Sequence, residues 1–251
     1  MKQHIPRIAI GLAIMLFFAG HAARFYNVGL ITQLDNIIYD ARMRLTMPKT
    51  VDPRVVILDI DEKSLQQVGR WPWPRDVMAR LVDKLFDQYG VTLVGFDVVF
   101  AEADYSSGIR ALDELAQNQL KQVPQFQDLY ARMRPGLDND GLFAQAIKGR
   151  PVVLGYYFSS DSDARRTGAI PAPVLPKGTF SGRNIAFTSW LGYGGNLPQF
   201  QNNAAAAGHF NPIVDFDGVV RRVPMLVELD GAYYESLSLA MVRTRIALKD
   251  G

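Results

Sequence analysis

The chain has 251 residues, of which 48% are hydrophobic and 21% charged, and this composition is typical of one sizeable folded domain with an appendage. Its 27 lysines and arginines nearly balance 25 aspartates and glutamates, so a net charge of +2 gives no reason to expect a nucleic acid partner. The sequence contains no cysteine, which excludes disulfides, thiolate metal sites and cysteine nucleophiles.

The chain begins with an apolar run at residues 8–23 that follows Lys2, His4 and Arg7. As a helix this run would span about 24 Å, somewhat short of the roughly 30 Å hydrocarbon core of a bilayer. We interpret residues 1–24 as an uncleaved membrane anchor whose positive end stays in the cytoplasm. A cleaved signal peptide and a buried core helix are the alternatives.

Residues 25–50 connect this segment to the rest of the chain. Apolar side chains recur there at spacings of three and four, which predicts an amphipathic helix. These side chains are Leu34, Ile37, Ile38, Ala41 and Leu45. The globular domain is expected to cover residues 51–251.

The first predicted strand lies at residues 55–58, where four apolar and mostly β-branched residues follow one another. Such a run is typical of a strand buried on both faces. The sequence GRWPWPR (69–75) follows, and the pattern predicts a helix over residues 74–89. A second apolar run at residues 91–100 predicts the next strand.

Strand, helix and strand within about 45 residues predict a βαβ unit with parallel strands. Because parallel strands align their carboxyl ends, the acids that follow these two strands are expected to gather at one edge of the sheet. They are Asp59, Asp61, Asp97, Glu102 and Asp104.

Five carboxylates at one edge would favour a divalent cation with oxygen ligands, calcium or magnesium. The alternative is that these acids cap helices or form ion pairs with arginines. The arginines available are Arg70, Arg75, Arg221 and Arg222. A metal-assisted hydrolase would also need a base, and only His209 is offered by the sequence, so we expect no catalytic residues.

The rest of the chain is expected to complete an α/β fold. Residues 104–138 predict a helical insertion, and Asp138 is the expected cap of a short helix that follows. A core strand at residues 151–158 would join the parallel sheet, and residues 184–190 predict a further strand. Asp217-Gly218 predicts an antiparallel hairpin of residues 209–216 and 219–229, and Asp230-Gly231 closes the next turn. A helix is expected over residues 234–248. The fold class is thus a parallel core sheet with flanking helices, a hairpin extension and an N-terminal transmembrane helix.

Six motifs, in order along residues 24–245, resemble the CHASE domain of the second type, the cyclase- and histidine-kinase-associated sensory extracellular domain. They are YDARMRL (39–45), VVILDIDEKSL (55–65), GRWPWPR (69–75), GFDVVFAEAD (95–104), GHFNPIVDFDGVVRRVP (208–224) and YYESLSLAM (233–241).

This resemblance implies a sensor domain in the bacterial periplasm, held at the inner membrane by its N-terminal helix. It also implies a cytoplasmic output enzyme beyond residue 251, such as an adenylate or guanylate cyclase or a histidine kinase. We expect a homodimer, because such output enzymes work as dimers, and expect this part of the receptor not to be an enzyme itself. The alternatives are a scaffold for a partner protein and, less favoured, a metal-dependent periplasmic hydrolase.

Four residues are candidates for binding an unknown small ligand or periplasmic protein, namely Trp71, Trp73, Arg75 and His209. The two tryptophans could form an aromatic wall, although rings packed over the end of the sheet are the simpler interpretation. His209 could equally satisfy backbone groups near a hairpin.

Overall fold

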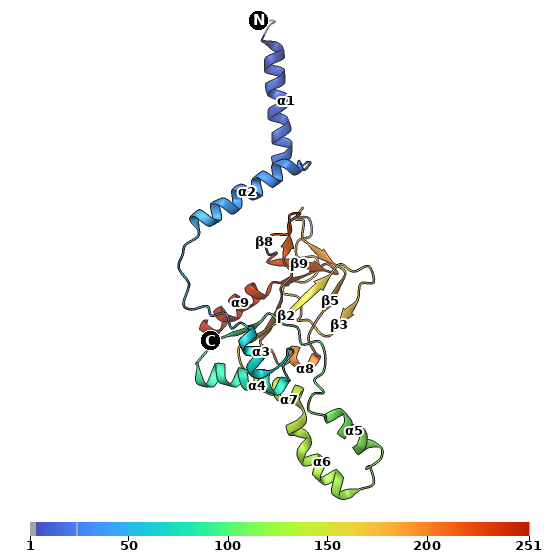
Figure 1. The fold of residues 1–251 in the computed structure, drawn as a ribbon. Helices are drawn as coiled ribbons and strands as arrows, with labels where there is room; N and C mark the ends of the chain where they lie inside the picture. The colour runs from blue at the N-terminus through green and yellow to red at the C-terminus, as the bar shows by residue number, and fades with distance from the viewer. Residues whose placement is uncertain (1–3, 24, 251) are drawn as a thin grey trace. The chain divides into compact units, whose positions relative to one another are not determined.

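The structure is a computed structural model that describes residues 4–23 and 25–250 (Figure 1). It divides into two compact units, Met1–Ile60 and Asp61–Gly251, which we describe separately. The second unit combines several sheets with helices, so the predicted mixed α/β class is confirmed.

The first unit contains two helices. α1 (Ile5–Ala22) covers the apolar run, and its large side chains are exposed at successive positions around the helix, from 46% at Phe17 to 68% at Ile8. Within the part of the chain that the structure describes, no helix reaches the length and apolarity that crossing a membrane requires. α2 (Gly29–Thr46) forms where the amphipathic helix was expected.

The prediction of a strand at residues 55–58 is wrong. These residues have no regular secondary structure, and their side chains are 61–88% exposed. An apolar run indicates that a segment can enter a sheet, but a strand also needs a partner for its backbone hydrogen bonds. The next strand in the sequence, at residues 94–96, pairs with residues 152–154 instead.

The main sheet of the second unit has a parallel core. β1 (Val94–Phe96), β2 (Val152–Ser159) and β6 (Ala206–His209) run in the same direction, and β2 pairs with both of the others. The strand predicted at 151–158 and its parallel pairing are thus confirmed, whereas the strand predicted at 91–100 is reduced to three residues. At its carboxyl end β2 also pairs with antiparallel β5 (Gly192–Gly194), which pairs with β3 (Arg166–Thr167).

Helices α4 and α7 cover the core, and the insertion extends away from it (Figure 1). The helix predicted over residues 74–89 forms as α4 with a π-helical continuation, η1. The insertion folds into two helices, as expected, and the Asp138 side chain caps α7 by accepting from the Gly141 N–H at 2.9 Å. The helices are α3 (Glu62–Val68), α4 (Arg75–Asp83), η1 (Lys84–Gln88), α5 (Ile109–Gln117), α6 (Pro124–Leu137), α7 (Asn139–Ile147) and α8 (Pro198–Gln201).

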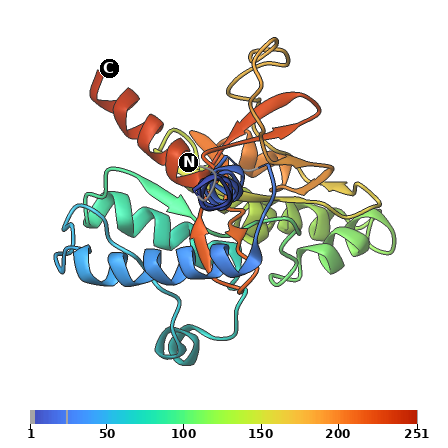
Figure 2. The ribbon, with the colours of Figure 1, turned by 90° about the horizontal axis from the view of Figure 1, so that it is seen from above.

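Antiparallel strands and a last helix complete the second unit. β7 (Ile213–Val214) pairs with β8 (Val220–Arg222), which confirms the predicted hairpin at Asp217-Gly218. β9 (Leu226–Leu229) pairs with β10 (Ala232–Glu235) across the predicted turn, so residues 234–235 belong to a strand and not to the predicted helix. The strand predicted at 184–190 is limited to β4 (Ser189–Trp190), which pairs with β9. α9 (Leu237–Asp250) follows, and Figure 2 shows its C-terminal end leaving the sheet.

Aromatic rings fill the space between the sheet and the helices. Phe100, Phe143 and Phe200 are fully buried and meet edge to face, with ring centroids 4.9–5.9 Å apart. Rings in this geometry add about 0.5–1.5 kcal/mol per pair beyond the burial of their area. The three rings therefore fix the segment after β1, α7 and α8 relative to one another.

Candidate functional site

The predicted gathering of five acids at one sheet edge is not seen. Asp59 belongs to the first unit, Asp61 caps α3 by accepting from the Ser64 N–H at 2.8 Å, and Asp97 and Glu102 are exposed. Among residues 4–23 and 25–250, no three histidines, aspartates or glutamates form a group that could hold a metal ion. Binding of calcium or magnesium stays one of the two interpretations of these acids, beside helix capping and ion pairing.

Asp104 instead takes part in a hydrogen-bonded cluster with Arg75 and α7. Its Oδ2 accepts from the Arg75 backbone N–H at 2.7 Å and from Asn139 Nδ2 at 3.0 Å, and its own N–H donates to Asp140 Oδ2 at 3.1 Å. Burial alone would raise the pKa of Asp104, but hydrogen bonds from Arg75, Ser106 and Asn139 outweigh it, so this pKa lies below its usual range. The bond from the Arg75 N–H, at the first residue of α4, agrees with the alternative that these acids cap helices.

Arg75 is buried, and its guanidinium stacks on the Phe100 ring at 4.7 Å. Its Nε lies 4.0 Å from Asp140 Oδ1, and neither atom has a hydrogen-bond partner in the described part of the chain. Burial lowers the pKa of Arg75 and raises that of Asp140, because both charges are taken out of water. Arg221 and Arg222 both contact Asp215 in the β7–β8 hairpin.

Two of the four predicted ligand-binding residues lie together. Trp71 and Arg75 line a cavity of about 290 Å³ with Pro72 and residues 98–102. Trp73 is buried, its ring meets Trp71 edge to face at 5.7 Å, and its Nε1 donates to the Gly69 carbonyl at 2.8 Å. Trp73 therefore packs in the interior, as the simpler interpretation of the tryptophans expected.

His209 lies in β6 and lines neither of the cavities described here. Its side chain is fully buried, beside the Phe158 ring at 5.7 Å, and within the described residues neither ring nitrogen has a partner. Burial lowers its pKa to about 4, because the charged imidazolium would lose its hydration there. His209 is thus a neutral core residue at physiological pH.

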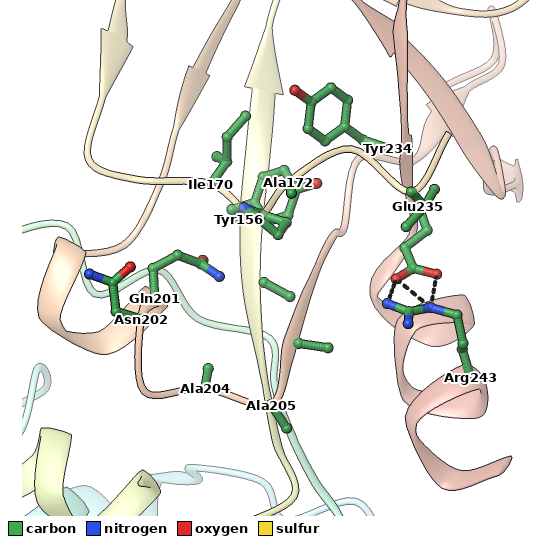
Figure 3. A pocket seen from close by; sticks show the side chains of 14 residues that line it. Tyr156, Ile170, Ala172, Gln201, Asn202, Ala204, Ala205, Tyr234, Glu235 and Arg243 are labelled. Atoms are coloured by element: carbon green, nitrogen blue, oxygen red, sulfur yellow. Dashed lines mark hydrogen bonds and ion pairs between the residues drawn. The ribbon is translucent and has the colours of Figure 1, made fainter. Parts of the chain in front are cut away.

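A larger cavity, of about 340 Å³, lies beside the central strand and was not predicted. Figure 3 shows Tyr156 of β2 between Gln201 of α8 on one side and Tyr234 and Glu235 of β10 on the other. The walls combine small apolar side chains with polar groups. The lining residues are Tyr156, Ile170, Pro171, Ala172, Val174, Gln201, Asn202, Ala204, Ala205, Ala206, Ala207, Tyr234, Glu235 and Arg243.

The residues that line this cavity carry buried polar groups of two kinds. Glu235, only 3% exposed, accepts from Arg243 Nε at 3.0 and 3.1 Å and from its Nη2 at 2.5 Å (Figure 3). The Tyr156 hydroxyl and Gln201 Oε1 are buried and have no hydrogen-bond partner among the described residues. Burial raises the pKa of Tyr156, so its hydroxyl keeps its proton and can donate.

Sequence reasoning missed this cavity because its walls come from segments far apart in the chain. Two local signals pointed to it. Glu235 is a lone acid within a strand whose neighbours are aromatic, and the run of four alanines at 204–207, which received no structural assignment, provides side chains too small to fill the space beside Tyr156.

The cavity lies beside the central strand of an α/β fold, and its lining combines small apolar side chains with polar groups. The chain belongs to the CHASE2 family, since the family model described as CHASE2 domain matches residues 9–250. CHASE2 domains are extracellular sensor domains of signalling receptors, so the resemblance seen in the six motifs is confirmed. No curated protein and no solved structure matches the chain.

Proposed function

We propose that the chain is the periplasmic sensor part of a receptor in the bacterial inner membrane. In this proposal, a stimulus at the sensor changes the activity of a cytoplasmic output enzyme, such as an adenylate or guanylate cyclase or a histidine kinase. The observation that carries the proposal is the match to an extracellular sensor family along nearly the whole chain, at residues 9–250.

The surface of α1 supports its role as the membrane anchor. Eight large apolar side chains between Ile8 and Phe18 are 46–68% exposed, and soluble proteins rarely leave so much contiguous apolar surface uncovered. Lys2 and Arg7 precede this surface in the sequence, and cytoplasmic ends of membrane helices are rich in such residues. We therefore assign the amino terminus to the cytoplasm and the second unit to the periplasm.

The Glu235–Arg243 pair supports a route by which a stimulus could act. Glu235 lies in β10 and lines the cavity, whereas Arg243 lies in the second turn of α9. An occupant that favours one arrangement of this pair would favour one position of α9, the last helix of the sensor, by shifting an existing equilibrium.

Exposed apolar residues also favour a protein partner, and we propose a second copy of the chain. The β7–β8 hairpin and its flanks carry five large side chains that are 43–66% exposed, namely Val214, Phe216, Val219, Val220 and Val223. A homodimer agrees with output enzymes that act as dimers. If the partner were another periplasmic protein, the chain would instead serve as a scaffold.

The coding sequence beyond residue 251 tests the receptor proposal without any protein. We expect further apolar spans followed by the motifs of a cyclase or a kinase. A stop codon directly after residue 251 would contradict the proposal, because the sensor would then have no output to control.

A further inference from the structure

We propose that the outward face of α9 docks onto a lipid surface that carries negative charge. The inference rests on the proposed attachment of the chain to a membrane, and it goes beyond that attachment by naming a second contact with lipid, made by the sensor unit itself. It is argued from the exposure, the charge and the helical spacing of the side chains of α9.

The inner face of α9 packs on the sheet. Leu237, Ala240 and Thr244 recur at spacings of three and four, so they lie on one face of the helix. Ala240 is fully buried and the other two side chains are half-buried, in agreement with the contacts of α9 with β6 and β2. This face provides the single apolar stripe that a helix at the surface of a globular domain needs.

A second apolar stripe lies on the opposite face of α9. Leu239, Val242 and Ile246 also recur at spacings of three and four, and a turn of about 100° per residue directs them away from the inner face. Val242 and Ile246 are each 55% exposed, and every residue from 245 to 249 is exposed where the helix leaves the sheet (Figure 2). Packing within the second unit therefore does not account for this outer stripe.

Positive charges flank the outer stripe. Arg243 lies on one side of it, Arg245 and Lys249 lie on the other, and all three are exposed. Arg243 is paired with Glu235, whereas Arg245 and Lys249 form no ion pair with any residue that the structure describes. An apolar stripe with cations along both sides is typical of helices that lie in the headgroup region of anionic lipids.

Charge decides between a second copy of the chain and lipid as the occupant of this face. A second copy of α9 would bring further cations to Arg245 and Lys249, and the helix has only one acid, Asp250 at its last position, to offset them. Anionic headgroups instead offer the opposite charge to both cations at once. Each cation then favours the docked helix by roughly fivefold.

A single fluorophore tests the contact, because the chain has no cysteine of its own. Ile246→Cys is labelled with an environment-sensitive dye, and the full chain is placed in nanodiscs of phosphatidylcholine, with or without phosphatidylglycerol, that contain a nitroxide-labelled lipid as quencher. We expect strong quenching only in the discs with phosphatidylglycerol, and its loss at high salt, since salt screens the attraction. The same dye at Lys121→Cys, in the insertion that Figure 1 shows away from α9, controls for attraction of the dye itself to lipid.

Equal quenching at Ile246→Cys in both kinds of disc, or none in either, would overturn the inference. A change in the emission of the dye without quenching by the labelled lipid would also overturn it, because the contact would then be with protein.

Substitution of the two unpaired cations shows whether charge carries the contact. Arg245→Gln combined with Lys249→Gln keeps the apolar stripe, and we expect it to lower the ratio of docked to free helix by about 25-fold. Lys121→Gln combined with Arg132→Gln is the control, since it removes two exposed cations of the insertion. Unchanged quenching in the α9 variant would overturn the inference.

Elution of the chain with the discs measures anchoring by α1 separately. A chain that elutes with neutral and anionic discs but shows no quenching refutes the docking of α9 and leaves the anchor in place. A chain that elutes only with anionic discs, and is quenched there, supports the docking and contradicts the anchor.

Discussion

At the scale of single residues, His209 shows how burial changes the behaviour of a side chain that the sequence offers as a ligand. A histidine near the turn of a hairpin is a reasonable candidate for binding. The structure places it instead in the parallel core, at the end of the β2–β6 pairing, with no polar partner among the described residues. Its pKa of about 4 is therefore a property of folding stability rather than of a binding site.

This shift predicts a loss of stability in acid. Above pH 6.5, the pKa of the unfolded state, His209 is neutral in both the folded and the unfolded chain. Between pH 6.5 and about pH 4, only the unfolded chain binds a proton at this residue. The free energy of unfolding therefore falls as the pH falls through this range. The difference between the two pKa values of His209 corresponds to a loss of about 3 kcal/mol in the free energy of unfolding. Chemical denaturation at pH 7.5 and pH 4 should show that His209→Leu loses less stability than the wild type over this range. An equal loss in both proteins would show that His209 is not the group responsible.

The acidic residues also give a residue-scale prediction. Because the Asp104 carboxylate accepts from the Arg75 backbone N–H and from Asn139, hydrogen bonding accounts for its position without a cation. We expect the melting temperature to be the same in calcium, magnesium and EDTA, since a ligand raises it only by binding the folded state. A rise of several degrees with either cation, lost in Asp104→Asn, would instead support the cation site.

At the scale of elements, local sequence patterns correctly predicted the turns between strands and the cap of a helix. Asp217-Gly218 and Asp230-Gly231 lie at the turns of the two hairpins, and Gly218 and Gly231 adopt the positive φ of 79° and 82° that such turns need. Asp138 caps α7 as expected. The strand at residues 55–58 failed because its apolar pattern carries no information about which strand would pair with it.

The candidate site was predicted only in part for the same reason. Trp71 and Arg75 are close in sequence and lie in one cavity, whereas the cavity at Tyr156 joins β2, a loop at 170–174, α8, β6, β10 and α9. Which of these segments become neighbours is decided by the pairing of β2 with β6 and by the packing of α9 on β6, and single-sequence patterns do not contain either contact.

The contact between α9 and β10 yields a prediction at this scale. Arg243→Ala would leave the buried Glu235 carboxylate without its partner, and we expect the free energy of unfolding to fall by about 1–3 kcal/mol. This loss of stability is smaller than the loss expected for a fully buried ion pair, because the Arg243 side chain is 57% exposed and its charge is partly screened by water. Arg245→Ala, an exposed position on the same helix, is the matched control in urea denaturation. Equal effects of the two substitutions would argue against a special role for the pair.

At the scale of the whole molecule, the second unit contains its own core. The buried rings of Phe100, Phe143 and Phe200, the parallel strands and α9 all lie within residues 61–251. The first unit contributes α1 and α2, whose apolar side chains are largely exposed. This division agrees with a membrane-proximal segment joined to a separately folded sensor.

The location of that folded unit is the central claim, and the absence of cysteine from the sequence allows it to be measured directly. Lys121→Cys introduces a single thiol at an exposed position of the insertion, and Val152→Cys places one in the fully buried part of β2. Intact cells are treated with a membrane-impermeant maleimide. We predict labelling of Lys121→Cys in intact cells and of Val152→Cys only after denaturation. Labelling of Lys121→Cys only after the inner membrane is broken would place the domain in the cytoplasm and contradict the proposed sensor.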